Sequence, residues 1–484
     1  MRRRTGLAIA TVLVLAAGCV GGQAVLSKGW LPIGPGVGSL FVPRFVGEPV
    51  SAQPLPTFEP PQNPHLAANG RNSMHNDAYA TDAYTHPGPL GRKVHVTSAW
   101  YGVSECATLT FDRAGRLIGL CGGILGPRLK FIDSKSLVVQ ASLDLPGRVL
   151  RAGVSPLEDL CGGAYFYLDN EDRAVVATTD RSVWVVEVPS LVTQRVFSLA
   201  SWVPKNDCLI SLMPDWSGHI WFVTSAGIVG ALDPASGEVK TVVLQGERIA
   251  NSFAVDETGG VFIVSDHALY RFDAGVKLTW RRAYDRGGRL KPSQLSQGSG
   301  TTPTLTGGGR VAITDNAEPR MNVLVYDRTD GRLVCSAGVF RSGESATENS
   351  IVAVGDSLLV ENNFGYTGPL STLGGDVTAQ GVARVDVVDG KCVNVWESAE
   401  RAPSSVPKAS YATGLLYVYT RPSEVDSAAW YLSAIDIRTG RTAFRVLSGV
   451  GMQWNNHYAA IALGPDGSAY VATLFGLIRI YDTD

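Results

Sequence analysis

The stretch Leu232-Asp233-Pro-Ala-Ser-Gly237 decides the fold, because its pattern of a short apolar run, an acidic residue and a small turn recurs along the chain. The acidic residues of the seven other copies are Asp133, Glu187, Asp273, Asp327, Asp386, Asp436 and Asp482. From first to last, the average step is about 50 residues. Recurrence at a fixed period of this size is typical of repeat architectures, so eight copies predict eight structural units.

A second marker, a tight turn between alternating strands, precedes most copies. Phe111–Gly115 and Val255–Gly259 are examples, in which Asp and Gly supply the backbone conformations that hairpins need. The flanks are β-branched and aromatic, as in 260–264, and no segment shows sustained helical spacing. Each unit therefore predicts four short antiparallel strands, which form a propeller blade. We predict an all-β chain in which residues 71–484 form a single eight-bladed β-propeller.

The eighth copy ends at Asp484, after its third strand. The segment Arg92–Trp100, just before the first blade, has the composition of a strand and can supply the missing outer one. Pairing of this segment with the final strand near Ile478–Tyr481 would close the ring and remove an exposed sheet edge.

The turns Asp233–Gly237 and Asp436–Gly440 resemble those of the quinoprotein-like (PQQ-repeat) propeller superfamily, whose members typically have eight blades. The resemblance covers the whole propeller. The superfamily places Trp about eight residues after the turn Asp, whereas this chain has Ala141, Thr241, Cys335 and Phe444 there, with Trp280 and Trp396 nearby. It also lacks a vicinal cysteine pair. The resemblance therefore implies the non-catalytic branch, envelope lipoproteins whose propellers bind other proteins, rather than a quinone dehydrogenase.

Residues 1–28 have the layout of a bacterial export signal, with a basic start, an apolar run over Gly6–Val20 and the ending Leu15-Ala-Ala-Gly-Cys19. This ending resembles a lipobox, in which Cys19 would be lipidated. An uncleaved membrane anchor or plain secretion are the alternatives, and all three place the chain outside the cytoplasm. Residues 29–70 contain nine prolines, which predicts an extended tether that lifts the propeller off a membrane.

The composition agrees with a turn-rich globular protein. Of 484 residues, 45% are apolar, 18% are charged and 54 are glycine. These values exclude a disordered, collagen-like or coiled-coil chain. The formal net charge of -2 gives no indication of nucleic-acid binding.

Six cysteines remain beyond Cys19, an even number that suggests disulfides in an exported chain. Cys106 and Cys121 flank the turn at 112–115 symmetrically, which places them opposite each other in a hairpin. The positions in consecutive blades predict two further bonds, Cys161–Cys208 and Cys335–Cys392. A Cys106–Cys161 bond is the alternative.

The residues that precede each innermost strand are expected at one mouth of the axial channel. They are Glu105, Asp159, Asp207, Asn251, Thr302, Glu348 with Asn349, Lys408, and Asn456 with His457. Carboxylate and amide oxygens suit Ca²⁺, so Glu105, Asp207, Asn251, Glu348 and Asn349 are candidate ligands. A water-filled polar mouth is the alternative, and we prefer it.

Two further segments are candidates for binding. The long Gly- and Thr-rich insertion from Glu361 through Gly381 contains Asn363 and Tyr366, which join Asn456 and His457 as candidate ligand-binding residues. The polar stretch 72–84 either caps the channel, with His75 or Asp77 contributing to a site, or straps one blade. We prefer the strap.

These observations predict a membrane-tethered, extracytoplasmic propeller that binds an envelope protein or a small ligand without catalysis. The alternatives act at the mouth of the channel: a Ca²⁺-dependent hydrolase or lactonase, or a quinoprotein-like oxidoreductase.

Overall fold

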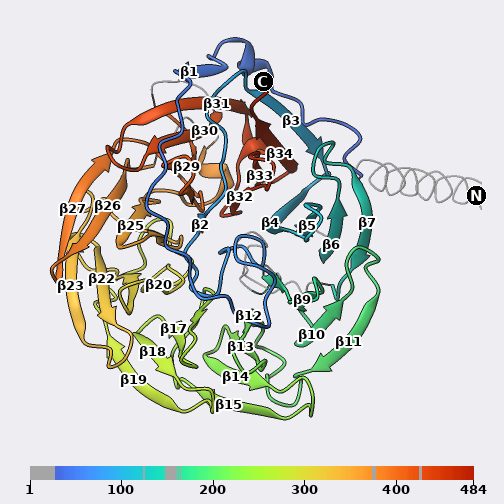
Figure 1. Cartoon of the computed structure of the whole chain (residues 1–484), viewed down its shortest axis with the longest axis vertical. Helices are drawn as coiled ribbons and strands as arrows, with labels where there is room; N and C mark the ends of the chain where they lie inside the picture. The colour runs from blue at the N-terminus through green and yellow to red at the C-terminus, as the bar shows by residue number, and fades with distance from the viewer. Residues whose placement is uncertain are drawn as a thin grey trace, which may run out of the picture.

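The computed structural model describes residues 28–123, 126–147, 161, 163, 165–372, 378–423 and 428–483. In it, eight antiparallel sheets are arranged around a central axis (Figure 1). Only short 3₁₀ segments interrupt the strands in this part of the chain, namely η1 (Val37–Leu40), η3 (Pro369–Thr372) and η4 (Met452–Trp454). The all-β, eight-bladed architecture predicted from the repeats is confirmed.

Each blade has four strands, ordered from the innermost, beside the axis, to the outermost, at the rim. Blade 1 consists of β4 (Ser104–Phe111), β5 (Leu117–Gly123), β6 (Gly126–Ile132) and β7 (Val139–Asp144). Blade 2 consists of β8 (Phe166–Leu168), β9 (Ala174–Ala177), β10 (Ser182–Val186) and β11 (Thr193–Ser198). Blade 3 consists of β12 (Leu209–Pro214), β13 (Ile220–Thr224), β14 (Ile228–Leu232) and β15 (Val239–Val243). Blades 4 and 5 are β16 (Ala254–Val255), β17 (Val261–Val264), β18 (Ala268–Phe272) and β19 (Leu278–Ala283); and β20 (Thr304–Thr306), β21 (Arg310–Thr314), β22 (Asn322–Asp327) and β23 (Leu333–Gly338). Blades 6 and 7 are β24 (Val352–Val354), β25 (Ser357–Glu361), β26 (Val382–Val388) and β27 (Lys391–Ser398); and β28 (Lys408–Ser410), β29 (Leu415–Thr420), β30 (Ala429–Asp436) and β31 (Thr442–Val450). Blade 8 is β32 (Ile461–Leu463), β33 (Ala469–Thr473), β34 (Gly476–Tyr481) and, from the N-terminal side, β3 (His95–Trp100).

This topology gives the ring two different faces. The short turns between the first and second and between the third and fourth strands of each blade lie on one side, which we call the turn face. The connections between blades, and those between second and third strands, lie on the other side, the loop face. The long insertion of blade 6 follows β25 and therefore belongs to the loop face.

Acidic residues stabilise both kinds of turn. In the repeated set, Asp233 Oδ1 accepts the backbone N–H of Ala235 at 2.8 Å, and backbone N–H groups are bound in the same way by Asp133, Asp273, Asp327 and Asp436. The aspartates that begin the turns between first and second strands act alike. Asp112 Oδ1 accepts the backbone N–H groups of Ala114 and Arg116 at 3.0 and 2.9 Å. Asp169, Asp215 and Asp256 bind the corresponding N–H groups in their own turns. The sixth copy differs, because Asp386 lies within β26 and pairs with Arg384, while the chain turns at Asp389–Gly390.

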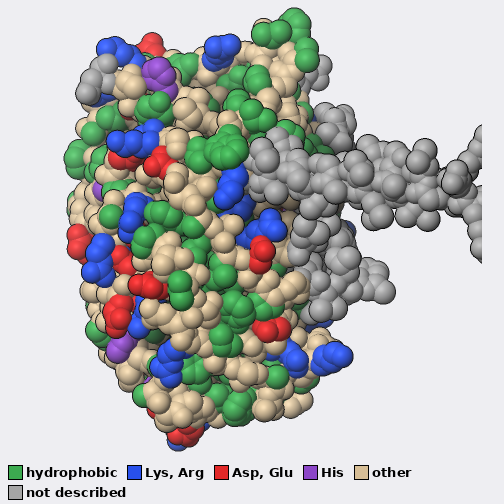
Figure 2. All heavy atoms as spheres, turned by 90° about the vertical axis from the view of Figure 1, so that its right-hand side faces the viewer, with side chains coloured by type: hydrophobic (Ala, Val, Ile, Leu, Met, Phe, Trp, Pro, Cys, Tyr) green, Lys and Arg blue, Asp and Glu red, His purple; other side chains and the backbone are tan. Residues whose placement is uncertain are grey.

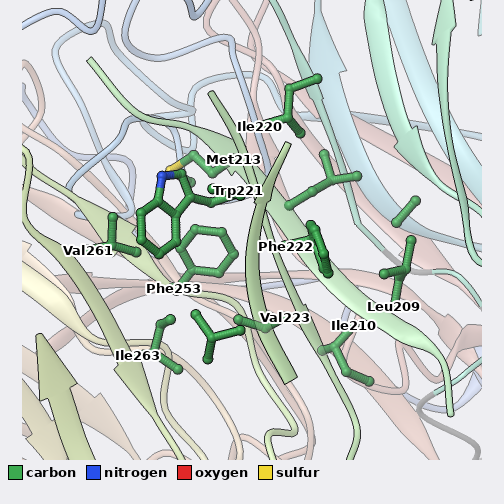
Figure 3. Packing of buried hydrophobic residues seen from close by; sticks show 14 of the residues in the cluster. Leu209, Ile210, Met213, Ile220, Trp221, Phe222, Val223, Phe253, Val261 and Ile263 are labelled. Carbon is green, nitrogen blue, oxygen red and sulfur yellow. The ribbon is translucent and has the colours of Figure 1, made fainter. Parts of the chain in front are cut away.

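Large apolar side chains pack between neighbouring blades. Trp221 of β13 is fully buried, and Figure 3 shows it beside Phe253 and Val261 of the next blade. Its indole N–H donates to Asp215 at 2.9 Å, so the polar edge of the ring is satisfied. On the rim of the ring, Figure 2 shows acidic and basic side chains interspersed.

Two tryptophans that the sequence placed near the family's docking position contact the next blade. The indole of Trp280 donates to Arg328 O at 3.1 Å and covers Gly331, where a Cβ would lie 2.7 Å from the ring. Trp396 donates to Ile437 O at 3.0 Å and covers Gly440 in the same manner. Both glycines have positive φ, so a larger residue would be excluded both by strain and by the indole.

The ring closes as the sequence predicted. β3 pairs with β34 in antiparallel register, with His95 opposite Tyr481 and Trp100 opposite Gly476. The eighth repeated acid, Asp482, accepts the backbone N–H groups of Leu90 and Arg92 at 2.6 and 3.1 Å. This carboxylate therefore links the end of β34 to the segment just before β3, two strands that pair without a connecting loop.

The proline-rich segment differs from the free tether that its composition predicted. It is largely extended, but β1 (Phe45–Gly47) pairs with β31 at the outer edge of blade 7. Farther along, the backbone N–H groups of Gln53 and Leu55 donate to blade 7, and Phe58 covers Gly307 of blade 5. Proline removes N–H donors without preventing such isolated contacts, so residues 28–70 lie along the ring.

The preferred disulfide pairing is the one observed. Cys106 and Cys121 are directly opposite on β4 and β5. Cys161–Cys208 joins the inner parts of blades 2 and 3, and Cys335–Cys392 joins the outer strands β23 and β27. The alternative Cys106–Cys161 bond does not form. Two of the three bonds therefore link neighbouring blades.

Candidate functional site: the plugged axial channel

Residues 63–84, which we call the plug, run from the turn face into the centre of the ring (Figure 1). Backbone hydrogen bonds of 2.8–3.1 Å join the plug to the inner strands of five blades; the pairs are Ala67–Leu168, Ala78–Val255, Tyr79–Leu305, Thr81–Ala353 and Asp82–Ala409. β2 (Ala83–Tyr84) adds a parallel pairing to β28. The preference for a strap over one blade was therefore wrong. Each innermost strand has an unpaired edge toward the axis, and the plug satisfies several of these edges at once.

A charged cluster lies at the inner end of the plug. Lys408, at the start of β28, donates to the carboxylate of Asp82 and to Met74 O. His75 Nδ1 lies 3.1 Å from the same carboxylate, and its Nε2 lies 3.3 Å from the Thr302 hydroxyl. Lys408 and Asp82 are completely buried. Burial acts to raise the pKa of Asp82, but Lys408 and His75 outweigh it and hold this pKa below its usual value.

Asp77 is buried in the plug and forms no direct ion pair with any described residue. It accepts the backbone N–H of Tyr79 at 2.9 Å, the backbone N–H of Thr81 at 3.2 Å and the Thr81 hydroxyl. Burial raises the pKa of Asp77 to about 7 against these hydrogen bonds. The carboxyl therefore titrates near neutral pH inside the channel.

Four of the residues expected at the loop-side mouth share an uncommon property. Glu105, Asp207, Asn251 and Glu348 each have one buried side-chain N or O atom without a hydrogen-bond partner among the described residues. Burial raises the pKa of Glu105 and of Glu348 well above the usual value. Native proteins rarely leave such atoms unsatisfied except beside water or a ligand. These four side chains therefore make this part of the channel polar and able to hydrogen-bond to water or a ligand.

Asn349 and Asn363 hold another buried carboxyl, that of Glu361 at the end of β25. Asn363 Nδ2 donates to Glu361 Oε1 at 3.0 Å, and Asn349 Nδ2 donates to the same oxygen. Asn363 also donates to Ala402 O and accepts the Glu348 backbone N–H at 2.9 Å. Burial raises the pKa of Glu361 well above its usual value. Asn363 thus links blades 6 and 7 instead of presenting its amide to solvent.

Tyr366 of the insertion and His457 of blade 8 do come together. The Tyr366 hydroxyl lies 3.0 Å from His457 Nδ1 and donates to Asn455 Oδ1 at 3.1 Å. Tyr366 is buried, and burial raises its pKa beyond the physiological range, so it remains a neutral phenol. Asn456 is directed elsewhere, since its amide binds Ser404 and Ala459. Of the four candidate ligand-binding residues, two therefore form a pair and two have structural partners.

The described residues contain no group of three or more His, Cys, Asp or Glu side chains placed to hold a metal ion. Glu105, Asp207 and Glu348 are therefore not grouped closely enough in this part of the chain to hold one ion by themselves. A calcium role for the set with Asn251 and Asn349 stays a prediction that this geometry does not strengthen.

Two sequence candidates, Asp159 and Cys19, lie outside the described residues. Within the part of the chain that the structure covers, no helix is long and apolar enough to cross a membrane. The role of Asp82 was missed in the sequence, although Lys408 at the start of an inner strand was a usable signal, because a buried lysine needs a counter-ion.

Comparisons with known proteins add little to this description. No family model matches the chain. Over 375 residues it is 26% identical to an uncharacterized protein of Archaeoglobus fulgidus, covering 69% of this chain and 72% of that protein. The crystal structure of BamB from Moraxella catarrhalis aligns with 90% of this chain and 100% of that chain, with a TM-score of 0.48 and 12% identity. The chain is an eight-bladed β-propeller, the architecture that its resemblance to PQQ-repeat proteins implied, and its own eight sheets establish this.

Proposed function

We propose that this protein is an extracytoplasmic, membrane-tethered propeller that binds an envelope protein or a small ligand on its loop face, without a catalytic step. One observation carries the proposal: the plug occupies the channel from the turn face and binds the inner strands of five blades. A ligand that approaches the axis therefore has to come from the loop face, where the blade 6 insertion lies.

The three disulfides support an oxidising compartment outside the cytoplasm. Tethering rests on the export signal and on Cys19, as the sequence predicts. Loops on a rigid scaffold are common binding surfaces, and the insertion is fixed to its neighbours by Asn363 and by the Tyr366–His457 contact. Such anchoring reduces the conformational entropy that a partner would otherwise have to remove.

Site-specific photo-crosslinking in envelopes tests the proposal. A photoreactive amino acid replaces Leu370 or Leu290 on the loop face, and matched controls replace Leu278 or Leu333, which follow turns on the other face. All four leucines are exposed, at 70, 52, 44 and 48% respectively. We expect a discrete adduct from the loop-face positions that persists in a metal chelator. Adducts from the turn-face positions alone, or none from any position, would contradict the proposal.

A metal-dependent hydrolase is the second candidate: Glu105, Asp207 and Glu348 each bury an oxygen without a partner among the described residues, although the three are not grouped around one ion. Stoichiometric Ca²⁺ in the purified full-length protein, with a hydrolytic activity that is lost on chelation, would favour it over the binding scaffold.

A further inference from the structure

A cavity of about 290 Å³ opens on the loop face where blades 4, 5 and 6 meet. Arg289 and Lys291 reach it from the connection between β19 and β20, and Glu318 and Pro319 from the connection between β21 and β22. Ser345 and Phe364 come from the connections that precede β24 and follow β25. We call it the Lys291 cavity. Its volume is at the lower end of the range for small-molecule sites.

The ammonium group of Lys291 is buried without an anionic partner. The residue is only 4% exposed, and Nζ donates to Ala317 O at 2.8 Å and to Ser345 O at 3.1 Å. Within the described ranges, no carboxylate oxygen lies within 4 Å of it. An ammonium has three N–H donors, so one donor has no acceptor among the described residues and the charge has no direct ion pair, which is uncommon for a buried lysine.

The acids nearest to Lys291 already have other partners. Glu318 Oε1 accepts from Arg289 Nε at 2.8 Å, which neutralises that pair. Asp315 is bound by the side-chain amide and backbone N–H of Asn322 at 2.8 and 2.6 Å. Burial lowers the pKa of Lys291, while these two acids act to raise it. Asp315 and Asp285 do not line the cavity, although both act on the ammonium group. The lining itself has two cations, Arg289 and Lys291, and one anion, Glu318, and so carries one net positive charge.

Ser345 offers a second donor. Its hydroxyl oxygen accepts the Met321 backbone N–H at 2.9 Å, and no described acceptor takes its hydrogen. Phe364 gives the cavity an apolar wall, and its position is fixed because the Gly365 N–H donates to Pro292 O at 3.1 Å. The cavity thus combines a cation, a hydroxyl donor and an aromatic ring.

We propose that the Lys291 cavity binds a small organic monocarboxylate. The carboxylate accepts hydrogen bonds from Lys291 Nζ and the Ser345 hydroxyl, and its apolar body packs against Phe364. One net positive charge on the lining matches a monoanion better than a phosphate dianion. This inference rests on the proposed function, because it names the class of small ligand that the loop face would bind.

Binding of hexanoate and benzoate to the full-length protein tests the inference, with hexanamide and benzamide as neutral counterparts. Ligand-observed NMR and calorimetry would report the affinities. We expect at least one acid to bind in the millimolar range or tighter and at least about tenfold more tightly than its amide. Lys291→Met should remove this preference, and Phe364→Ala should weaken acid and amide alike. Lys240→Met, at an exposed lysine of β15, is the matched control and should change neither.

Ser345→Ala keeps the test decisive if Lys291→Met does not fold, because it removes one donor and leaves the ammonium in place. We expect it to reduce the acid preference at least about threefold. Three results would overturn the inference. They are equal binding of acids and amides, no binding of either acid at about 10 mM, and retention of the preference in Lys291→Met. None of these results would affect the crosslinking experiment, which uses Leu290 and Leu370 and does not require the cavity.

Discussion

Replacing Lys408 by Met should destabilise the propeller strongly, because the substitution removes a charge and leaves the carboxylate of Asp82 buried. Both side chains are completely buried, and Asp82 would keep only His75 as a partner. Breaking a buried pair in this way costs about 3–5 kcal/mol. Unfolding entropy scales at about 2.1 cal/mol/K per residue, so for a chain of this size each kcal/mol lowers the Tm by about 1 °C. We therefore expect a decrease of about 3–5 °C.

Thermal unfolding, followed by circular dichroism at about pH 7.5, measures the change in Tm. Lys130→Met is the control: this lysine is also buried, but it contacts the Tyr101 ring and the Ser104 hydroxyl, and no carboxylate of the described ranges pairs with it. Its replacement should leave the Tm unchanged or raise it. The double variant Lys408→Met/Asp82→Asn should recover part of the loss, since no charge remains unpaired. A Lys408→Met protein as stable as the parent would refute the argument.

Four further outcomes are expected. Deletion of residues 92–100 removes β3, exposes an edge of β34 and should cause aggregation, so a soluble deletion variant that melts like the parent would contradict the closure. Because the folded pKa of Asp77 is raised to about 7, this residue should lower stability as pH rises from about 4 to about 7, by on the order of 4 kcal/mol; Asp77→Asn should remove this share of the decrease in pH-dependent denaturation, leaving the share of the buried glutamates. Removing the Cys335–Cys392 bond by a double serine substitution should cost about 2–4 kcal/mol in urea unfolding, and an unchanged midpoint would deny it a stabilising role. Cys19→Ser should leave the protein soluble or unprocessed while the parent partitions into detergent; equal partitioning would favour an uncleaved anchor.

The repeat made the ring predictable, because local rules determine each blade. The acids that begin the turns, such as Asp112 and Asp233, bind N–H groups two to four residues away, and this relation is visible in the sequence. Cys106 and Cys121 were also predictable, since symmetry about one turn places them opposite each other.

The site could be predicted only in part, because it depends on contacts between residues far apart in the chain. The sequence identified the residues before the inner strands as candidates, but whether Asn363 faces solvent or Glu361 depends on the backbone path of the insertion. The plug was harder still. A polar stretch such as 72–84 has no period of its own, and its position follows from contacts with inner strands that lie up to 334 residues away in the chain.

The plug and the two added strands also constrain the order in which the chain can fold. β1 and β3 need β31 and β34, and the plug needs inner strands up to β28, so residues 28–100 have no complete partners until the C-terminal blades exist. A chain that leaves an export channel N-terminus first would therefore hold this segment unpaired throughout translocation. Assembly of the ring, its axis and its closure should then occur together, in one late step after the last residues emerge.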